Sequence, residues 1–154
     1  VLMNVVAFMQ CPWFEPRTPK ELVDRYTTDQ QFHQRLLENT MSGRRLVQAF
    51  GHELFHEIWW DNVAPATDHA AGKMPTDMQH VERVIRAQQA DLILTFGKQA
   101  EDAIKQSLQA TRIKTMACHH PNARFKFQED LDNFAQQTRE WISARTFERS
   151  EHEP

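Results

Sequence analysis

Short continuous apolar runs alternate along the chain with stretches in which apolar residues recur at helical spacing. The runs cover residues 3–9, 58–60, 92–96 and 113–117, and the first has β-branched residues at its centre. A run such as residues 3–9 is typical of a buried strand, and the other three segments are also interpreted as strands. The pattern therefore predicts four strands.

The stretches between the runs predict helices. In residues 43–56 the apolar stripe consists of Leu46, Val47, Phe50 and Leu54, and Ser42 is expected to cap that helix at its start. Further helices are predicted over residues 19–26, 30–37, 75–89, 97–109 and about 128–144. Residues 148–154 are strongly charged and are expected to form a frayed tail.

Alternation of strands and helices is typical of right-handed βαβ crossovers, which build a parallel sheet covered by helices on both faces. We therefore predict a three-layer α/β/α fold with a four-stranded parallel sheet. No internal repeat or linker is evident. The sequence is read as one domain over residues 1–147, followed by the charged tail.

Composition limits the class of protein further. The chain has 154 residues, of which 40% are hydrophobic, so it can bury a core of its own. Its two cysteines, Cys11 and Cys118, provide neither a disulfide framework nor a four-cysteine metal cluster. The two cysteines fit a reducing cytoplasm, and no apolar run is long enough to span a membrane. We also expect a monomer. The net charge of −3 weighs against a nucleic-acid partner, although a few well-placed cations would serve a small site.

Polar or aromatic residues follow each of the four predicted strands. Ligands of open parallel sheets bind beyond the carboxyl ends of the strands, so these residues are expected to share one site. They are Gln10, Cys11, Trp13, Phe14 and Glu15 after the first strand, Asp61 and Asn62 after the second, Gly97 and Lys98 after the third, and His119, His120, Asn122 and Arg124 after the fourth.

Several of these segments also match a family pattern. Met9-Gln10-Cys11-Pro12-Trp13 stands where that family has a Gly-Gln-Asp-Pro-Tyr segment, and Trp59-Trp60-Asp61-Asn62-Val63 is similar to its strand ending in a base-reading asparagine. Residues 92–100 are similar to its strand, glycine turn and alanine-rich helix, and His120-Pro121-Asn122-Ala123 stands in place of its His-Pro-Ser-Pro loop. By the order and spacing of these segments, residues 3–142 resemble the uracil-DNA glycosylase superfamily.

The resemblance implies an enzyme that flips a nucleotide out of DNA and hydrolyses its N-glycosidic bond without a cofactor, leaving an abasic site. His120 would then donate to the departing base, Asn62 would read the base edge, and Gln10 would lie against the base or the water. Cys11, Trp13 and Phe14 would shape the base pocket, and the two aromatic rings could stack on the base. DNA phosphates would be held by Ser42, Gly43 and Arg44 at a helix start resembling the family's, and by Lys98, Asn122 and Arg124.

The chain also departs from the family pattern. Cys11 replaces the aspartate that activates water, so Glu15 or Asp61 would have to take over that role, and Met9 replaces a glycine. The altered first segment favours a non-standard base, such as glucosylated hydroxymethylcytosine in phage DNA, and hence antiviral defence. Uracil excision in repair is the first alternative. A non-catalytic module that binds DNA or a nucleotide is the second, favoured by Cys11.

A competing motif is His52-Glu53-Leu54-Phe55-His56, which matches the H-E-x-x-H signature of zinc proteases. At helical spacing, His52 and His56 fall opposite the apolar stripe and are expected to face solvent. Glu82 is a conceivable third ligand without further support. We therefore expect no metal and rank a zinc hydrolase last.

Overall fold

A computed structural model describes residues 3–10, 12, 18–65, 75–118 and 127–152. Its strands are β1 (Val5–Met9), β2 (Trp59–Asn62), β3 (Leu92–Phe96) and β4 (Lys114–Cys118). They form one sheet in the order β2-β1-β3-β4, and every pair is parallel. The α/β class and the four-stranded parallel sheet predicted from the sequence are confirmed.

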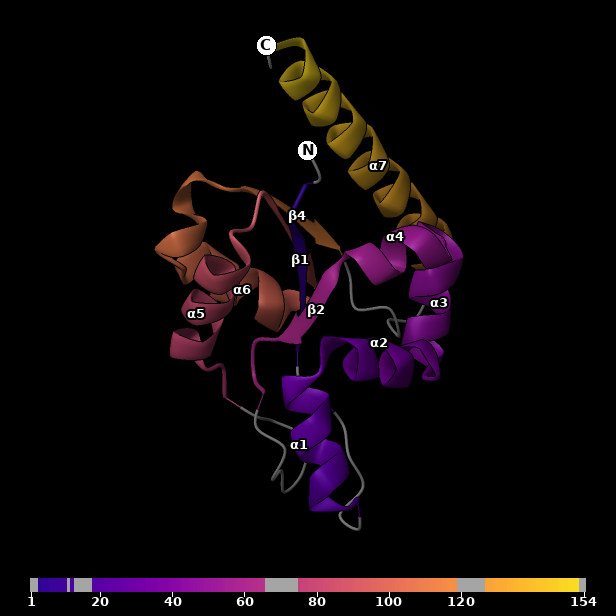
Figure 1. Ribbon diagram of the computed structural model, residues 1–154, viewed down its shortest axis with the longest axis vertical. Coiled ribbons are helices and arrows are strands. Elements are labelled where there is room, and N and C mark those ends of the chain that lie inside the picture. The colour runs from indigo at the N-terminus through magenta and orange to yellow at the C-terminus, as the bar shows by residue number, and fades with distance from the viewer. Residues whose placement is uncertain (1–2, 11, 13–17, 66–74, 119–126, 153–154) are drawn as a thin grey trace.

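Helices cover the sheet on both faces (Figure 1). The helices α5 (Met78–Gln88) and α6 (Lys98–Gln106) lie on one face, and a short 3-10 helix, η1 (Gln109–Arg112), follows α6. On the other side lie α2 (Gln30–Glu38), α3 (Met41–Phe50), α4 (His52–Glu57) and α7 (Phe127–His152). Helix α1 (Lys20–Thr28) lies past the end of the sheet at which the strands terminate.

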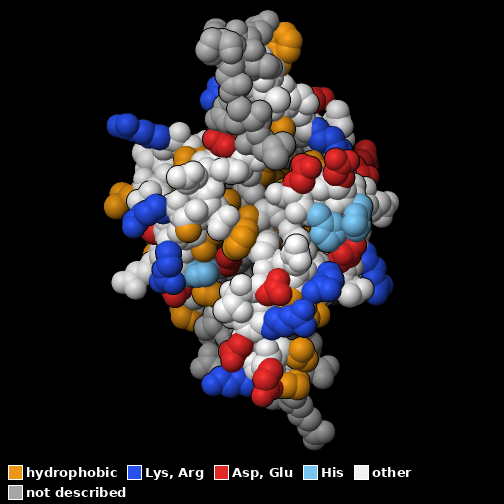
Figure 2. Space-filling view, viewed as in Figure 1, with side chains coloured by type: hydrophobic (Ala, Val, Ile, Leu, Met, Phe, Trp, Pro, Cys, Tyr) orange, Lys and Arg blue, Asp and Glu red, His pale blue; other side chains and the backbone are white. Residues whose placement is uncertain are grey.

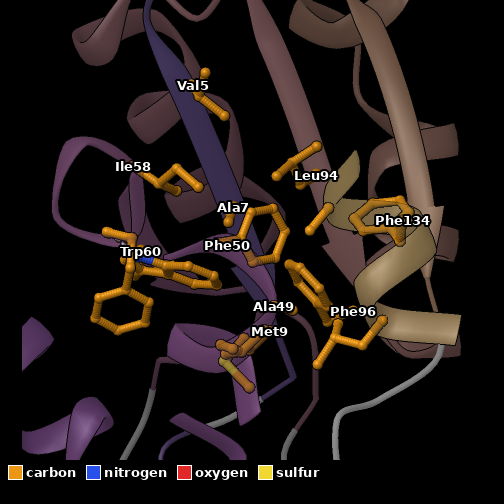
Figure 3. Close-up of a cluster of buried hydrophobic side chains, with 14 of the residues drawn as sticks. Val5, Ala7, Met9, Ala49, Phe50, Ile58, Trp60, Leu94, Phe96 and Phe134 are labelled. Atoms are coloured by element: carbon orange, nitrogen blue, oxygen red, sulfur yellow. Dashed lines mark hydrogen bonds between the residues drawn. The ribbon is translucent and has the colours of Figure 1, made fainter. Parts of the chain in front are cut away.

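The core divides into two clusters because the side chains of β1 alternate between the two faces. Val5, Ala7 and Met9 belong to the cluster beneath α3, α4 and α7, which Figure 3 shows. Val6 and Phe8 belong to the cluster beneath α5 and α6. In the larger cluster the fully buried Trp60 donates its indole N–H to the carbonyl of Phe55 at 2.8 Å, so its one polar atom is satisfied.

The single helix predicted over residues 43–56 is in fact two helices, α3 and α4. Gly51 separates them with a φ of +82°, a conformation that side-chain-bearing residues rarely adopt. The expected cap at Ser42 is also wrong. Thr40 caps α3 by accepting a hydrogen bond from the Gly43 N–H at 2.9 Å, and Ser42 lies buried inside the first turn.

The last helix is longer than predicted. Helix α7 has 26 residues and reaches His152, so the expected frayed tail is helical over 148–152. Despite this length it is not apolar enough to cross a membrane, and the same holds for every other helix among the described residues.

Replacement of Gly43 by alanine should destabilise the protein strongly. A Cβ atom at this position would lie 1.6 Å from the carbonyl oxygen of Leu37, at the end of α2. Because backbone atoms must then shift, we expect a loss of about 3 kcal/mol in the free energy of unfolding, measured by urea denaturation. Gln48→Ala, an exposed change on the same helix, should alter stability by no more than ~0.5 kcal/mol. Equal stability of the two variants would contradict this packing.

Candidate functional site

The carboxyl end of β2 presents a carboxylate that is held by three donors. Oδ1 of Asp61 lies 2.7 Å from Nε2 of His80 on α5 and accepts from the N–H of Asn62 at 2.8 Å. Oδ2 accepts from the indole N–H of Trp59 at 3.3 Å. The side chains of Asp61 and His80 are largely buried. This carboxylate is therefore better arranged to orient the imidazole of His80 than to bind a water directly.

The neighbouring Asn62 lies buried against α1 and α2. Its Nδ2 donates to the hydroxyl of Tyr26 at 3.1 Å, and the ring of Tyr26 stacks on that of His33 with centroids 4.0 Å apart. Burial lowers the pKa of His33 from 6.5 to about 4, although the nearby charge of Asp61 opposes this shift. His33 is thus neutral near pH 7.

Asp61, Asn62, His33 and His80 line one small cavity of about 50 Å³. This space can hold a few waters and is far below the ~300–1,000 Å³ typical of pockets for small ligands. The described residues at the end of β2 therefore build a water-sized recess beside the sheet edge.

A larger recess opens at the ends of β1, β3 and β4. Its volume is about 790 Å³, within the range of ligand sites, and α6 and α7 form its sides. Gln10 lies over Gly97, where a Cβ atom would come within 2.6 Å of Nε2 of Gln10. Gly97 has a φ of +97°, a conformation that favours glycine, whereas the flexible end of the Gln10 side chain could move away from a Cβ atom. Polar side chains around the recess are Gln10, Lys98, Glu101, Asp130, Asn133 and Gln137.

The structure thus brings some predicted site residues together at one edge of the sheet. Gln10 and Lys98 line the larger recess, and Asp61 and Asn62 line the smaller one. Cys11, Trp13, Phe14, Glu15, His120, Asn122 and Arg124 lie outside the described residues.

The predicted phosphate site at residues 42–44 loses two of its backbone donors. The N–H groups of Gly43 and Arg44 are both bonded to Thr40, through its side chain and its carbonyl, and Ser42 is buried. Those amides are satisfied within the protein and do not form an anion site. Arg44 remains exposed, with its guanidinium donating to the carbonyl of Asn39 at 3.3 Å.

Sequence reasoning missed Tyr26, His33 and His80. Tyr26 is the one tyrosine of the chain, and His80 follows the helix cap Asp77 by three residues. Neither fact indicates that the side chain reaches β2, because the contacts join residues that are 19 or more positions apart.

The histidines of the H-E-x-x-H segment lie elsewhere. His52 is exposed as expected, but His56 is only 30% exposed and lines a different cavity, so its expected orientation to solvent is wrong. The carboxylate facing both rings is that of Glu38. Glu82 instead caps η1 by accepting from the N–H groups of Leu108 and Gln109.

No protein-family model matches this chain, and comparison with curated proteins likewise finds no match. Any functional assignment therefore depends on the residues and geometry described above.

The buried His33 should make stability depend on pH. Between pH 6.5 and about 4 the unfolded chain binds a proton at His33 that the folded chain does not bind. The free energy of unfolding should therefore fall as pH decreases through this window, by about 3 kcal/mol from this group. Urea denaturation at several pH values checks this: His33→Gln should show a shallower fall than the parent protein. Parallel curves for the two proteins would show that His33 is not buried in its neutral form.

Proposed function

We propose that this chain is a DNA glycosylase of the uracil-DNA glycosylase type, which hydrolyses the N-glycosidic bond of a flipped-out, non-standard base and leaves an abasic site. A bulky modified cytosine, such as glucosylated hydroxymethylcytosine of phage DNA, is the substrate class we favour. The observation that supports this most is the arrangement of the strand ends. Gln10 at the end of β1 lies between the Asp61–Asn62 pair of β2 and the glycine turn after β3.

The spacing of the strands suits a base at this edge. The outer strands β2 and β4 are three strand intervals apart, which corresponds to about 14 Å. Asn62 ends one of them, and the other ends at Cys118, two residues before His120. A planar base above Gln10 could contact polar side chains from both sides. The 790 Å³ recess beside Gln10 offers room for a substituent larger than that of uracil.

The pairing of Asp61 with His80 compensates for the absence of the family's aspartate at Cys11. An imidazole that donates its Nε2 proton to a carboxylate has Nδ1 as its basic nitrogen. In the proposed reaction, a water oxygen bonds to the sugar C1′ as the C1′–N bond breaks, and the water proton passes to His80. The base leaves with the bonding electron pair, and His120 donates to it.

Asn62 would read the edge of the base, and Tyr26 would set its orientation. The hydrogen bond from Nδ2 to the tyrosine hydroxyl restricts the rotation of the amide, so the carbonyl and amino groups present a defined pattern. Lys98 is an exposed cation that lines the larger recess, where it would hold a DNA phosphate. Its pairing with Asp102 at 3.6 Å involves two exposed side chains and costs little to break.

A base-release assay tests the proposal. Glucosylated phage DNA, uracil-containing DNA and unmodified DNA are incubated with the protein, and abasic sites are revealed by alkaline strand cleavage. We expect cleavage of the glucosylated DNA. Asp61→Asn and His80→Gln should each slow it by ~10²–10⁴-fold, because each removes part of the proton-accepting pair.

Asp24→Asn, an exposed carboxylate change on α1, is the matched control and should retain the parent rate. Inertness of the protein on all three DNAs would contradict the glycosylase proposal. Tight DNA binding without base release would identify a non-catalytic binding module instead. If Asp61→Asn and His80→Gln both keep the parent rate, the glycosylase proposal would stand, but the role of Asp61 and His80 in activating water would be excluded.

A further inference from the structure

Three potential metal ligands converge between the end of α2 and α4. Nε2 of His52 lies 3.2 Å from Oε1 of Glu38, and Nε2 of His56 lies 3.3 Å from Oε2. The ligand atoms of the three residues all fall within 4.8 Å of one another. Figure 2 shows histidine side chains gathered on the half of the surface that carries α2, α3 and α4, with acidic side chains beside them.

The two histidine–glutamate separations are close to those of a tetrahedral metal centre, and the ligand nitrogens of the two histidines lie within 4.8 Å of each other. Zinc binds imidazole nitrogen and carboxylate oxygen at about 2.0–2.1 Å, so neighbouring donors of a tetrahedral site lie about 3.3 Å apart. The two histidines stand at positions i and i+4 of one helix, which places both rings on one side. A small inward shift of each side chain would complete three coordination bonds.

Gln34 supplies the orientation that a ligating histidine needs. Its Nε2 donates to the carbonyls of His56 and Ile58, at 3.0 and 2.9 Å, which fixes the direction of the buried amide. Its Oε1 therefore faces Nδ1 of His56 at 3.3 Å and holds the ring proton there. Nε2 of His56 is left with its lone pair toward Glu38. This nitrogen is buried and has no hydrogen-bond partner among the described residues.

We propose that Glu38, His52 and His56 bind one divalent transition-metal ion of the zinc class, with water at the fourth position. Two imidazoles and one carboxylate suit zinc and exclude magnesium or calcium, which prefer all-oxygen sites. The bound ion would join the end of α2 to α4. It would also hold in place the short helix that leads directly into β2.

This site differs from the protease centre that the H-E-x-x-H motif suggests. Glu53 is exposed on α4 and does not belong to the cluster, so the glutamate that would act as the base is missing from the site. The cluster also lies before the start of β2, whereas the proposed base pocket lies beyond its end. The metal site is thus independent of the proposed glycosylase function.

Isothermal titration of the chelator-treated protein with ZnCl₂ tests the proposal. We expect one zinc ion to bind per chain, with an affinity that depends on all three ligands. We expect no binding of MgCl₂. His52→Ala, His56→Ala and Glu38→Gln should each weaken that binding at least about tenfold. Since the His52 side chain is 71% exposed, its variant should keep the fold. Glu53→Gln and Glu57→Gln, exposed carboxylate changes on the same helix, should bind zinc like the parent protein.

Cobalt(II) as a spectroscopic substitute separates this site from one built on cysteine. The expected spectrum shows tetrahedral d–d bands without a thiolate charge-transfer band, and His52→Ala should lose those bands. Zinc binding of equal affinity in the parent and the three ligand variants would overturn the proposal. A thiolate band that persists in His52→Ala would also overturn the proposal, and so would the absence of any zinc binding. In either case the cluster would be a pair of histidine–glutamate ion pairs.

Discussion

The hydrogen bonding of β1 on both of its edges is the constraint on which the rest of the structure depends. The strand is buried on both faces, so each of its peptide groups must find a partner within the sheet. β2 supplies those partners on one side and β3 on the other. The register places Met9 beside Asn62 and Phe8 beside Thr95, and the carboxyl ends of three strands consequently meet around Gln10. A slip of one residue would turn Asp61 and Asn62 to the wrong faces.

β2 connects the two sites proposed for this chain. Its four residues end in the Asp61–Asn62 pair, and its start follows directly on α4, which carries His52 and His56. Two glutamines of α2 hold this strand. Gln30 bonds to both backbone groups of Trp60, and Gln34 bonds to the carbonyls just before the strand. An ion between α2 and α4 would support the same arrangement, so a metal at the proposed site would also help to position the Asp61–Asn62 pair at the other end of β2.

Much of the fold follows from local patterns, whereas the site depends on distant contacts. The continuous apolar run at residues 92–96 and its glycine turn predicted β3 at the residues that it occupies. The break at Gly51 was missed because the apolar stripe continues across it from Phe50 to Leu54, and the cap at Thr40 was missed because Ser42 is an equally suitable cap residue. Asp61 and Asn62 could be predicted from their place after a strand. Their partners Tyr26, His33 and His80 could not, since each is brought to β2 by a helix whose position no local signal reveals.

We propose that the carboxyl edge of the sheet around Gln10 binds a nucleotide. Nuclear magnetic resonance of the 18.1 kDa protein tests it directly, through the side-chain amide signals of its asparagines and glutamines during titration with a duplex that carries an abasic-site analogue. We expect the signals of Gln10 and Asn62 to shift together, while that of Gln34, before the start of β2, stays unchanged. A shift of Gln34 with Gln10 and Asn62 unmoved would contradict the account, because the DNA would then bind at the opposite edge of the sheet.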